Sequence, residues 1–124
     1  MPSTELDTTS TVAKLAIRQL AAYNAHDLDA FCACYHAEVR VLEPSGEAVV
    51  VGNDALRSRY EGMFTAGNYG ATVDQRMVLG RHCVEREHWW RRSPESGERM
   101  SGTVFVRYTA RDGLIGTVVF FRPE

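Results

Sequence analysis

The spacing of hydrophobic residues divides the chain into a helical first half and a strand-rich second half. From about residue 7 to residue 25, apolar side chains recur every three or four positions, which is typical of one face of an amphipathic helix. Asp27 is placed to cap a shorter second helix, and Asn53 or Asp54 to cap a third. The pattern therefore predicts helices at about 7–25, 27–35 and 53–66.

Alternating polar and apolar residues predict strands elsewhere. Residues 38–43 alternate, the Pro44-Ser45-Gly46 turn follows, and residues 48–51 return as a partner strand. From Ala71 onward the period is strand-like, and Asp112-Gly113 is typical of a tight hairpin. The later strands are expected at about 72–80, 82–92, 99–110 and 114–122.

Helices followed by long antiparallel strands predict an α+β fold, with about three helices packed on a strongly curved, mostly antiparallel sheet. The 124 residues are enough for one domain, 1–124, in which we expect residues 1–7 to form a flexible N-terminal segment. A sheet that wraps around helices leaves a conical pocket between them, where a ligand would bind.

Charge and cysteine content narrow the class of protein. A formal net charge of -2 gives no electrostatic reason to expect a nucleic acid or membrane partner. No apolar run approaches the roughly 20 residues that span a bilayer. The three cysteines show no C-x-x-C spacing, so we expect reduced, buried thiols and a cytoplasmic location, in agreement with a polar N-terminus that lacks signal-peptide features.

The sequence contains no pattern that is typical of a metal or cofactor site. None of the four histidines shows the H-x-x-x-H or H-E-x-x-H spacing of a helical metal site. A glycine-rich phosphate loop and a G-x-S-x-G elbow are also missing from the sequence. We therefore expect neither a metal nor a cofactor.

Three short segments share their order and spacing with a known family. They are the run from Tyr23 to Phe31, the strand end and turn Glu43-Pro44-Ser45-Gly46, and the hairpin around Asp112-Gly113. Over roughly residues 8–122 the chain resembles the NTF2-like superfamily, in particular its SnoaL-like and ketosteroid-isomerase-like members. The resemblance implies a cone-shaped fold with an apolar cup that holds a small hydrophobic molecule.

By this resemblance, Glu43 stands where ketosteroid isomerases carry their general base, and strand alternation puts it on the inward face. A carboxylate there is expected to move a proton on a bound ketone. The alternative is a strand-end carboxylate that is solvated or paired with Arg40 or Arg59. Gln19 and Phe105 stand at the positions of the family's two enolate donors, so we do not expect the steroid isomerase reaction itself.

The strand at 82–92 carries polar and large residues on both faces. Glu85, Glu87 and Trp89 share one face, and Arg86, His88 and Trp90 share the other. Either one face lines a polar cavity while the other forms a dimer contact, or the strand is a solvent-exposed ladder of ion pairs. Similarity to small family members favours Glu87 and Trp89 inside. Because tryptophan on a sheet face is often an interface residue, we expect a homodimer that forms through the outer face of the sheet.

Five further residues are candidates for ligand binding: Tyr23, Tyr60, Phe105, Arg107 and Phe120. Tyr23 and Tyr60 also fit a simple role in the helix core, with hydroxyls that reach the pocket. Arg107 shares strand parity with Phe105, so we expect it to point into the cup and to pair with Glu43 or Glu87.

Two classes of function stay open at this point. The first is a cofactor-free enzyme, an isomerase, cyclase, dehydratase or hydrolase, that acts on a small hydrophobic carbonyl or epoxide compound through a carboxylate base. The second is a non-catalytic ligand-binding or dimerisation domain, because this fold hosts both. Polar groups that converge on one point of the pocket would favour catalysis.

Overall fold

The computed structural model describes residues 6–123, which form three helices and six strands. In chain order the elements are α1 (Thr11–Asn24), α2 (Leu28–Cys32), β1 (Tyr35–Leu42), β2 (Ala48–Val51), α3 (Asn53–Ala66), β3 (Tyr69–Leu79), β4 (His82–Arg92), β5 (Arg99–Arg111) and β6 (Leu114–Phe121). Every predicted helix and strand is present, with ends that differ by a few residues. The α+β prediction is confirmed.

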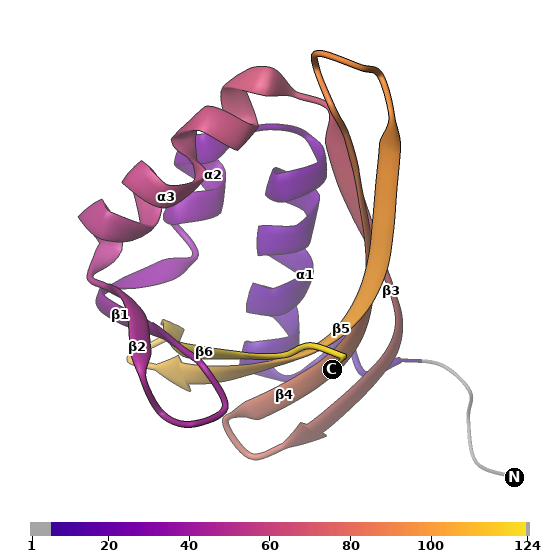
Figure 1. Cartoon of the computed structure of the whole chain (residues 1–124). Helices are drawn as coiled ribbons and strands as arrows, with labels where there is room; N and C mark the ends of the chain where they lie inside the picture. Colours follow the sequence, from indigo (N-terminus) through magenta and orange to yellow (C-terminus); the bar gives the residue numbers. More distant parts are fainter. Residues whose placement is uncertain (1–5, 124) are drawn as a thin grey trace, which may run out of the picture.

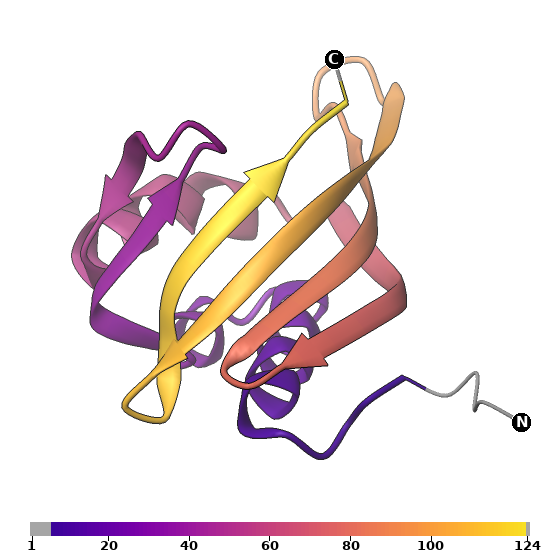
Figure 2. The same cartoon turned by 90° about the horizontal axis from the view of Figure 1, so that it is seen from below.

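The strands form one sheet in the order β2-β1-β6-β5-β4-β3. All neighbouring pairs are antiparallel except β1 and β6, which run parallel. The long strands β3, β4 and β5 bend around the helices (Figure 1), and Figure 2 shows the sheet from below. Because long strands twist, the sheet curls into a cup and does not stay flat. The prediction of a curved, mostly antiparallel sheet is confirmed.

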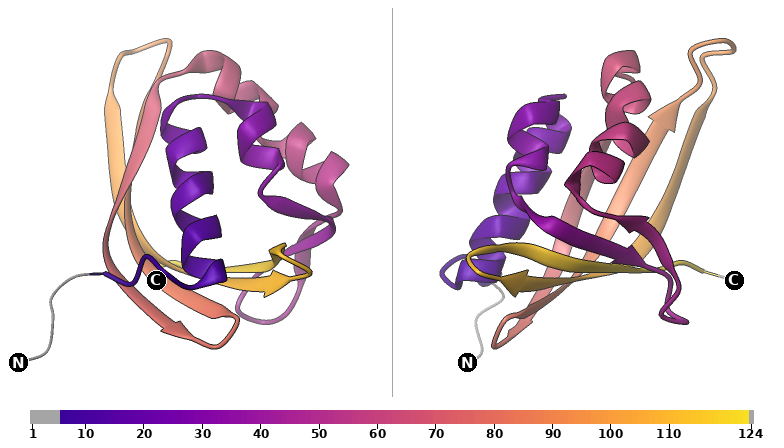
Figure 3. Two further views of the ribbon diagram at one scale, coloured as in Figure 1. Left: turned by 180° about the vertical axis from the view of Figure 1, so that it is seen from behind. Right: turned by 90° about the vertical axis from the view of Figure 1, so that its left-hand side faces the viewer.

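Helix α1 lies inside the curve of the sheet (Figures 1 and 3) and packs on β3, β4, β5 and β6. It begins at Thr11, later than the pattern predicted, because Ser10 Oγ accepts the N–H of Ala13 at 3.1 Å and caps the helix. Just before this cap, the Asp7 carboxylate accepts the N–H of Thr9 at 2.9 Å. The expected flexible segment at residues 1–7 lies mostly outside the described residues.

The caps of the other two helices differ from each other. Asp27 accepts an N–H from the first turn of α2, as predicted. For α3 the predicted side-chain cap is wrong, since the N-cap residue is Gly52. The Asn53 amide instead donates to the carbonyl oxygens of Cys32 and Tyr35, both at 3.0 Å. Asn53 therefore ties the start of α3 to the end of α2 and the start of β1.

An aromatic cluster fills the space between the helices and the sheet. Phe31 on α2 contacts the rings of Tyr60 and Phe64 on α3, each with a centroid distance of 5.1 Å. Tyr23 on α1 meets Tyr69 at 4.6 Å. The three cysteines are free and buried, which confirms their predicted role as small core residues. The cluster therefore packs the three helices and the start of β3 against one another.

Candidate functional site

A pocket of about 490 Å³ opens between the helices and the concave face of the sheet. It is lined by Gln19, Tyr23, Phe31, Tyr35, Arg59, Tyr60, Glu87, Trp89, Arg91, Gly102, Thr103, Val104, Tyr108, Phe120, Arg122 and Pro123. The volume lies within the range of about 300–1,000 Å³ that is common for small-molecule sites. Five of the predicted site residues line it together: Tyr23, Tyr60, Glu87, Trp89 and Phe120.

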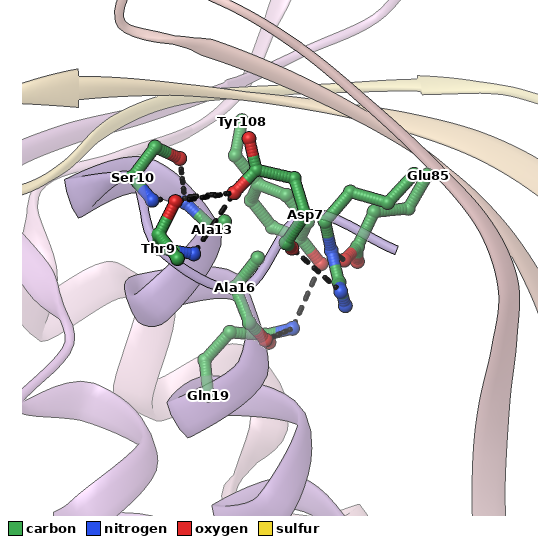
Figure 4. Close-up of polar contacts among 9 residues, drawn as sticks. Asp7, Thr9, Ser10, Ala13, Ala16, Gln19, Glu85 and Tyr108 are labelled. Carbon is green, nitrogen blue, oxygen red and sulfur yellow. Dashed lines mark hydrogen bonds and ion pairs between the residues drawn. The ribbon is translucent and has the colours of Figure 1, made fainter. Parts of the chain in front are cut away.

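A buried polar network lies at one side of this pocket. Gln19 is only 4% exposed, although it lies on the apolar face of α1. Its amide nitrogen donates to the Tyr108 hydroxyl at 2.9 Å and to the Ala16 carbonyl oxygen at 3.1 Å, and its amide oxygen accepts from the Tyr35 hydroxyl at 2.9 Å. Figure 4 shows Gln19 and Tyr108 reaching toward each other. Since the Tyr108 oxygen accepts here, its own proton stays available to a bound molecule.

Strand β4 supplies the wall opposite the helices. Glu87, Trp89 and Arg91 alternate with outward residues and therefore face the pocket. The Trp89 ring lies against Gly102 of β5, so closely that a Cβ at that position would be 2.7 Å from the ring. Glycine at position 102 thus makes space for the indole.

Glu87 is the only carboxylate among the described lining residues. Burial raises its pKa to about 7, the charge of nearby Glu85 adds to the rise, and Arg91 opposes it. Within residues 6–123 its carboxylate accepts no hydrogen bond from another group. A carboxyl group with a pKa near neutral pH can both accept and return a proton under physiological conditions.

Four lining tyrosines surround this carboxylate. Burial is the main cause that raises the pKa of Tyr23, Tyr35, Tyr60 and Tyr108, and the charge of Glu87 adds to it in each case. All four phenols therefore stay protonated near neutral pH and can donate hydrogen bonds. The Tyr60 hydroxyl makes no hydrogen bond to any described group, so it is a second donor available to a ligand.

Glu43 is not among the pocket-lining residues. Its carboxylate lies one residue beyond β1, 41% exposed, with Oε2 at 3.8 Å from Arg122 Nη1. Strand β1 ends at Leu42, and Glu43 begins the following turn, where its backbone N–H donates to the Glu47 carbonyl oxygen at 2.8 Å, so the alternation of β1 does not extend to its side chain. Glu43 thus reaches the pocket only through Arg122, which does line it.

Phe105 and Arg107 lie on the opposite face of β5 from the pocket. The inward residues of this strand are Val104, Val106 and Tyr108, all buried, whereas Phe105 is 51% exposed. The expectation that Phe105 and Arg107 point into the cup is therefore corrected, since alternation along a strand puts neighbours of inward residues outside. Arg107 forms no ion pair with Glu43, Glu87 or any other described carboxylate.

Beneath the pocket wall, Glu85 forms a buried ion pair with Arg76 of β3. Arg76 Nε is 2.6 Å from Glu85 Oε2, and the two side chains are 5% and 0% exposed. The Arg76 guanidinium also donates to the backbone carbonyl of Asp7 at 3.2 Å, and Figure 4 shows Asp7 and Glu85 beside the start of α1. This pair is structural, and the charge of Glu85 adds to the rise in the pKa of Glu87 that burial causes.

Sequence reasoning missed several lining residues, chiefly Gln19 as a network centre, Tyr35, Tyr108 and the arginines 59, 91 and 122. A polar residue on the apolar stripe of a helix is a visible signal, and it would have found Gln19. The other residues lack such a signal, because they meet only after the sheet bends.

No group of His, Cys, Asp and Glu side chains in the described part of the chain is arranged to hold a metal ion. Within residues 6–123, no helix is long and apolar enough to cross a membrane.

A model of the SnoaL-like domain matches residues 16–117, which is most of the chain. The chain belongs to the SnoaL-like domain family. This result confirms the resemblance drawn from the three short segments. In sequence, no curated protein matches this SnoaL-like domain.

Solved structures agree with the SnoaL-like fold. A Mycobacterium tuberculosis protein in complex with estradiol-17beta-hemisuccinate has a TM-score of 0.81 at 14% identity, covering 93% of this chain and 95% of its own. A delta 5-3-ketosteroid isomerase from Mycobacterium sp. has a TM-score of 0.78 at 17% identity, with the same coverages. A cystatin fold protein from Novosphingobium aromaticivorans has a TM-score of 0.76 at 23% identity, covering 92% and 99%. At these identities the similarity shows a shared fold.

Proposed function

We propose that this SnoaL-like domain binds a small, mostly apolar molecule in the pocket and moves a proton on it, with Glu87 as the acid-base group. The observation that carries the proposal is a single lining carboxylate with a pKa of about 7, surrounded by protonated phenols. Polar groups that converge in an apolar pocket are the usual arrangement of an acid-base site.

In this mechanism the ionised Glu87 removes a proton from a carbon next to a carbonyl group of the ligand. Negative charge then develops on the carbonyl oxygen, where the free O–H groups of Tyr60 and Tyr108 donate hydrogen bonds. Glu87 returns the proton to another carbon, which completes an isomerisation. Alternatively, the enolate carbon attacks a second carbonyl carbon of the same molecule, and Glu87 gives its proton to the alkoxide that forms, which completes a cyclisation. Both outcomes balance without a cofactor.

Glu43, the base implied by the family resemblance, is the second candidate for this role. Its carboxylate is next to Arg122 and is half exposed, so it is less desolvated than Glu87. We favour Glu87 because a base in an apolar environment needs less reorganisation of water when it reacts.

Nitrobenzisoxazole tests the proposal directly. This activated carbon acid loses its ring proton to a base, and its N–O bond breaks to give a coloured phenolate. We expect the wild-type rate to rise through about pH 7, following the ionisation of Glu87. Glu87→Gln should lower the rate by roughly 100-fold or more, the usual value of a positioned base.

Glu43→Gln is the matched control and should retain the wild-type rate. If it abolishes turnover while Glu87→Gln does not, then Glu43 is the base. If the wild type binds the probe but neither variant changes its reaction, the alternative of a non-catalytic binding domain is supported.

We also propose that the protein is a cytoplasmic homodimer that associates through the convex face of the sheet. Its three free cysteines support the location. Met77, Phe105 and Phe121 leave 70%, 51% and 39% of their surface exposed, and a second copy would cover them. Sedimentation equilibrium at micromolar concentration should give twice the chain mass, and a monomer mass would exclude the dimer.

A further inference from the structure

Three arginines from separate elements line the same pocket. Arg59 lies on α3, Arg91 is the second-last residue of β4, and Arg122 directly follows β6. All three arginines are exposed to solvent, so they lie at the mouth of the pocket. The pocket therefore has a positively charged mouth and an interior of aromatic rings, phenols and Glu87.

The negative charge near this mouth does not balance the arginines. Glu43 is close only to Arg122, at 3.8 Å. Within residues 6–123, neither Arg59 nor Arg91 forms an ion pair. Arg91 instead stacks on the Trp89 ring, with its guanidinium carbon 5.4 Å from the ring centroid. This cation–π contact holds a guanidinium at the mouth and leaves its N–H edge open to a ligand.

The field of these arginines extends into the pocket. Each of Arg59, Arg91 and Arg122 lowers the pKa of Tyr60, against the rise that burial causes. Arg91 acts in the same direction on the pKa of Glu87. The three side chains are therefore close enough to one another and to the pocket to act on one bound molecule.

We propose that the natural ligand is an amphiphilic anion, with an apolar body in the pocket and a carboxylate or similar anionic group at the arginine mouth. The apolar body rests on the proposed function above, whereas the anionic group is the new element. Arginine suits this role because its planar guanidinium binds a carboxylate through two parallel hydrogen bonds.

Strand geometry gives the distance between the two ends of the ligand. Glu87 and Arg91 share the inward face of β4, four residues apart, which is about 13 Å along an extended strand. The backbone positions that carry the two groups are therefore about 13 Å apart, and the ligand would span a distance of that order. A negative charge at that distance can pair with arginine. Its repulsion of the Glu87 carboxylate is weak, because the interaction falls with distance.

Two fluorescent probes with a common aromatic skeleton test the inference on the full chain. Anilinonaphthalene sulfonate carries an anionic group, and phenylnaphthylamine is its neutral counterpart. We expect the wild type to bind the sulfonate about tenfold more tightly, since exposed ion pairs contribute modestly and several act together. The preference should shrink as salt is raised, because the mouth is solvated.

The double variant Arg59→Gln/Arg91→Gln should remove this preference and leave the affinity for the neutral probe unchanged. The control Arg18→Gln/Arg81→Gln removes the same charge from exposed positions that do not line the pocket, and should keep the preference. This pattern would establish the anion site.

Other outcomes overturn the inference in distinguishable ways. If the wild type binds both probes equally, or if the preference survives in Arg59→Gln/Arg91→Gln, the anion site is excluded while the pocket still binds apolar molecules. An equal loss of preference in the control variant would show a general effect of net charge and would also exclude the site. If the wild type binds neither probe, the inference fails together with the proposed function.

Discussion

Replacing Glu87 by glutamine should make the protein more stable at alkaline pH and leave its stability unchanged under acidic conditions. Burial raises the pKa of this carboxyl from 4.5 to about 7. Between these two pKa values, the folded state holds a proton that the unfolded state releases. Wild-type stability therefore falls as the pH rises from about 4.5 to about 7. Glutamine has the same shape and carries no charge, so it does not lose this stability.

The expected size follows from the difference of about 2.5 between the two pKa values. At 1.36 kcal/mol for each pKa unit, ionised Glu87 costs the folded state about 3 kcal/mol above pH 8. Below pH 4.5 both proteins are neutral at this position, and the two free energies of unfolding should agree. For a domain of this size the alkaline difference corresponds to roughly 10 °C in Tm.

Urea unfolding followed by tryptophan fluorescence at pH 4.5, 6, 7 and 8 measures this difference. The comparison of variant with wild type at each pH cancels the titration of all other groups. Glu43→Gln, at a carboxylate that is 41% exposed, is the control and should show a much smaller change with pH. A difference between Glu87→Gln and wild type that is the same at every pH would refute the claim that Glu87 is held in a desolvated state.

Three further substitutions test other parts of the structure. Asn53→Ala should destabilise the protein by about 1–3 kcal/mol in urea unfolding, because two backbone carbonyl groups lose their donor; no loss would show that water replaces the amide. Arg76→Met should cost about 3–5 kcal/mol at neutral pH, since it leaves Glu85 buried without a partner, and adding Glu85→Leu should restore part of the loss. Gly102→Ala should displace the Trp89 ring, since its Cβ would lie within 2.7 Å of the ring; we expect weaker probe binding with a folded far-ultraviolet spectrum, and unchanged binding would contradict the tight fit.

Local information in the sequence determined the order and kind of the elements. Helical and strand periods depend on neighbours within a few residues, so they can be read before the chain folds. The β5–β6 hairpin is an example, because Asp112 and Gly113 both adopt positive φ, 52° and 77°, as an Asp-Gly turn requires. Local alternation also showed that Glu87 and Trp89 share one face of β4, although it left open which face points inward; in the structure, Glu87 and Trp89 line the pocket.

Only the tertiary structure decided which residues face the pocket at the strand ends. Strand β1 ends before Glu43, whose side chain is not part of the pocket lining, and the opposite parity of β5 puts Phe105 outside. The end of a strand and the face that it turns inward depend on how the strand pairs with its neighbours, which no local pattern specifies.

The same holds for the groups that give the pocket its chemistry. Gln19 meets Tyr108 across 89 positions of the chain, and the arginines of the mouth come from three different elements. Desolvation of Glu87 also exists only once the sheet has bent around the helices, since it depends on everything that excludes water there. The sequence by itself therefore determined the frame of the protein, and long-range packing determined its site.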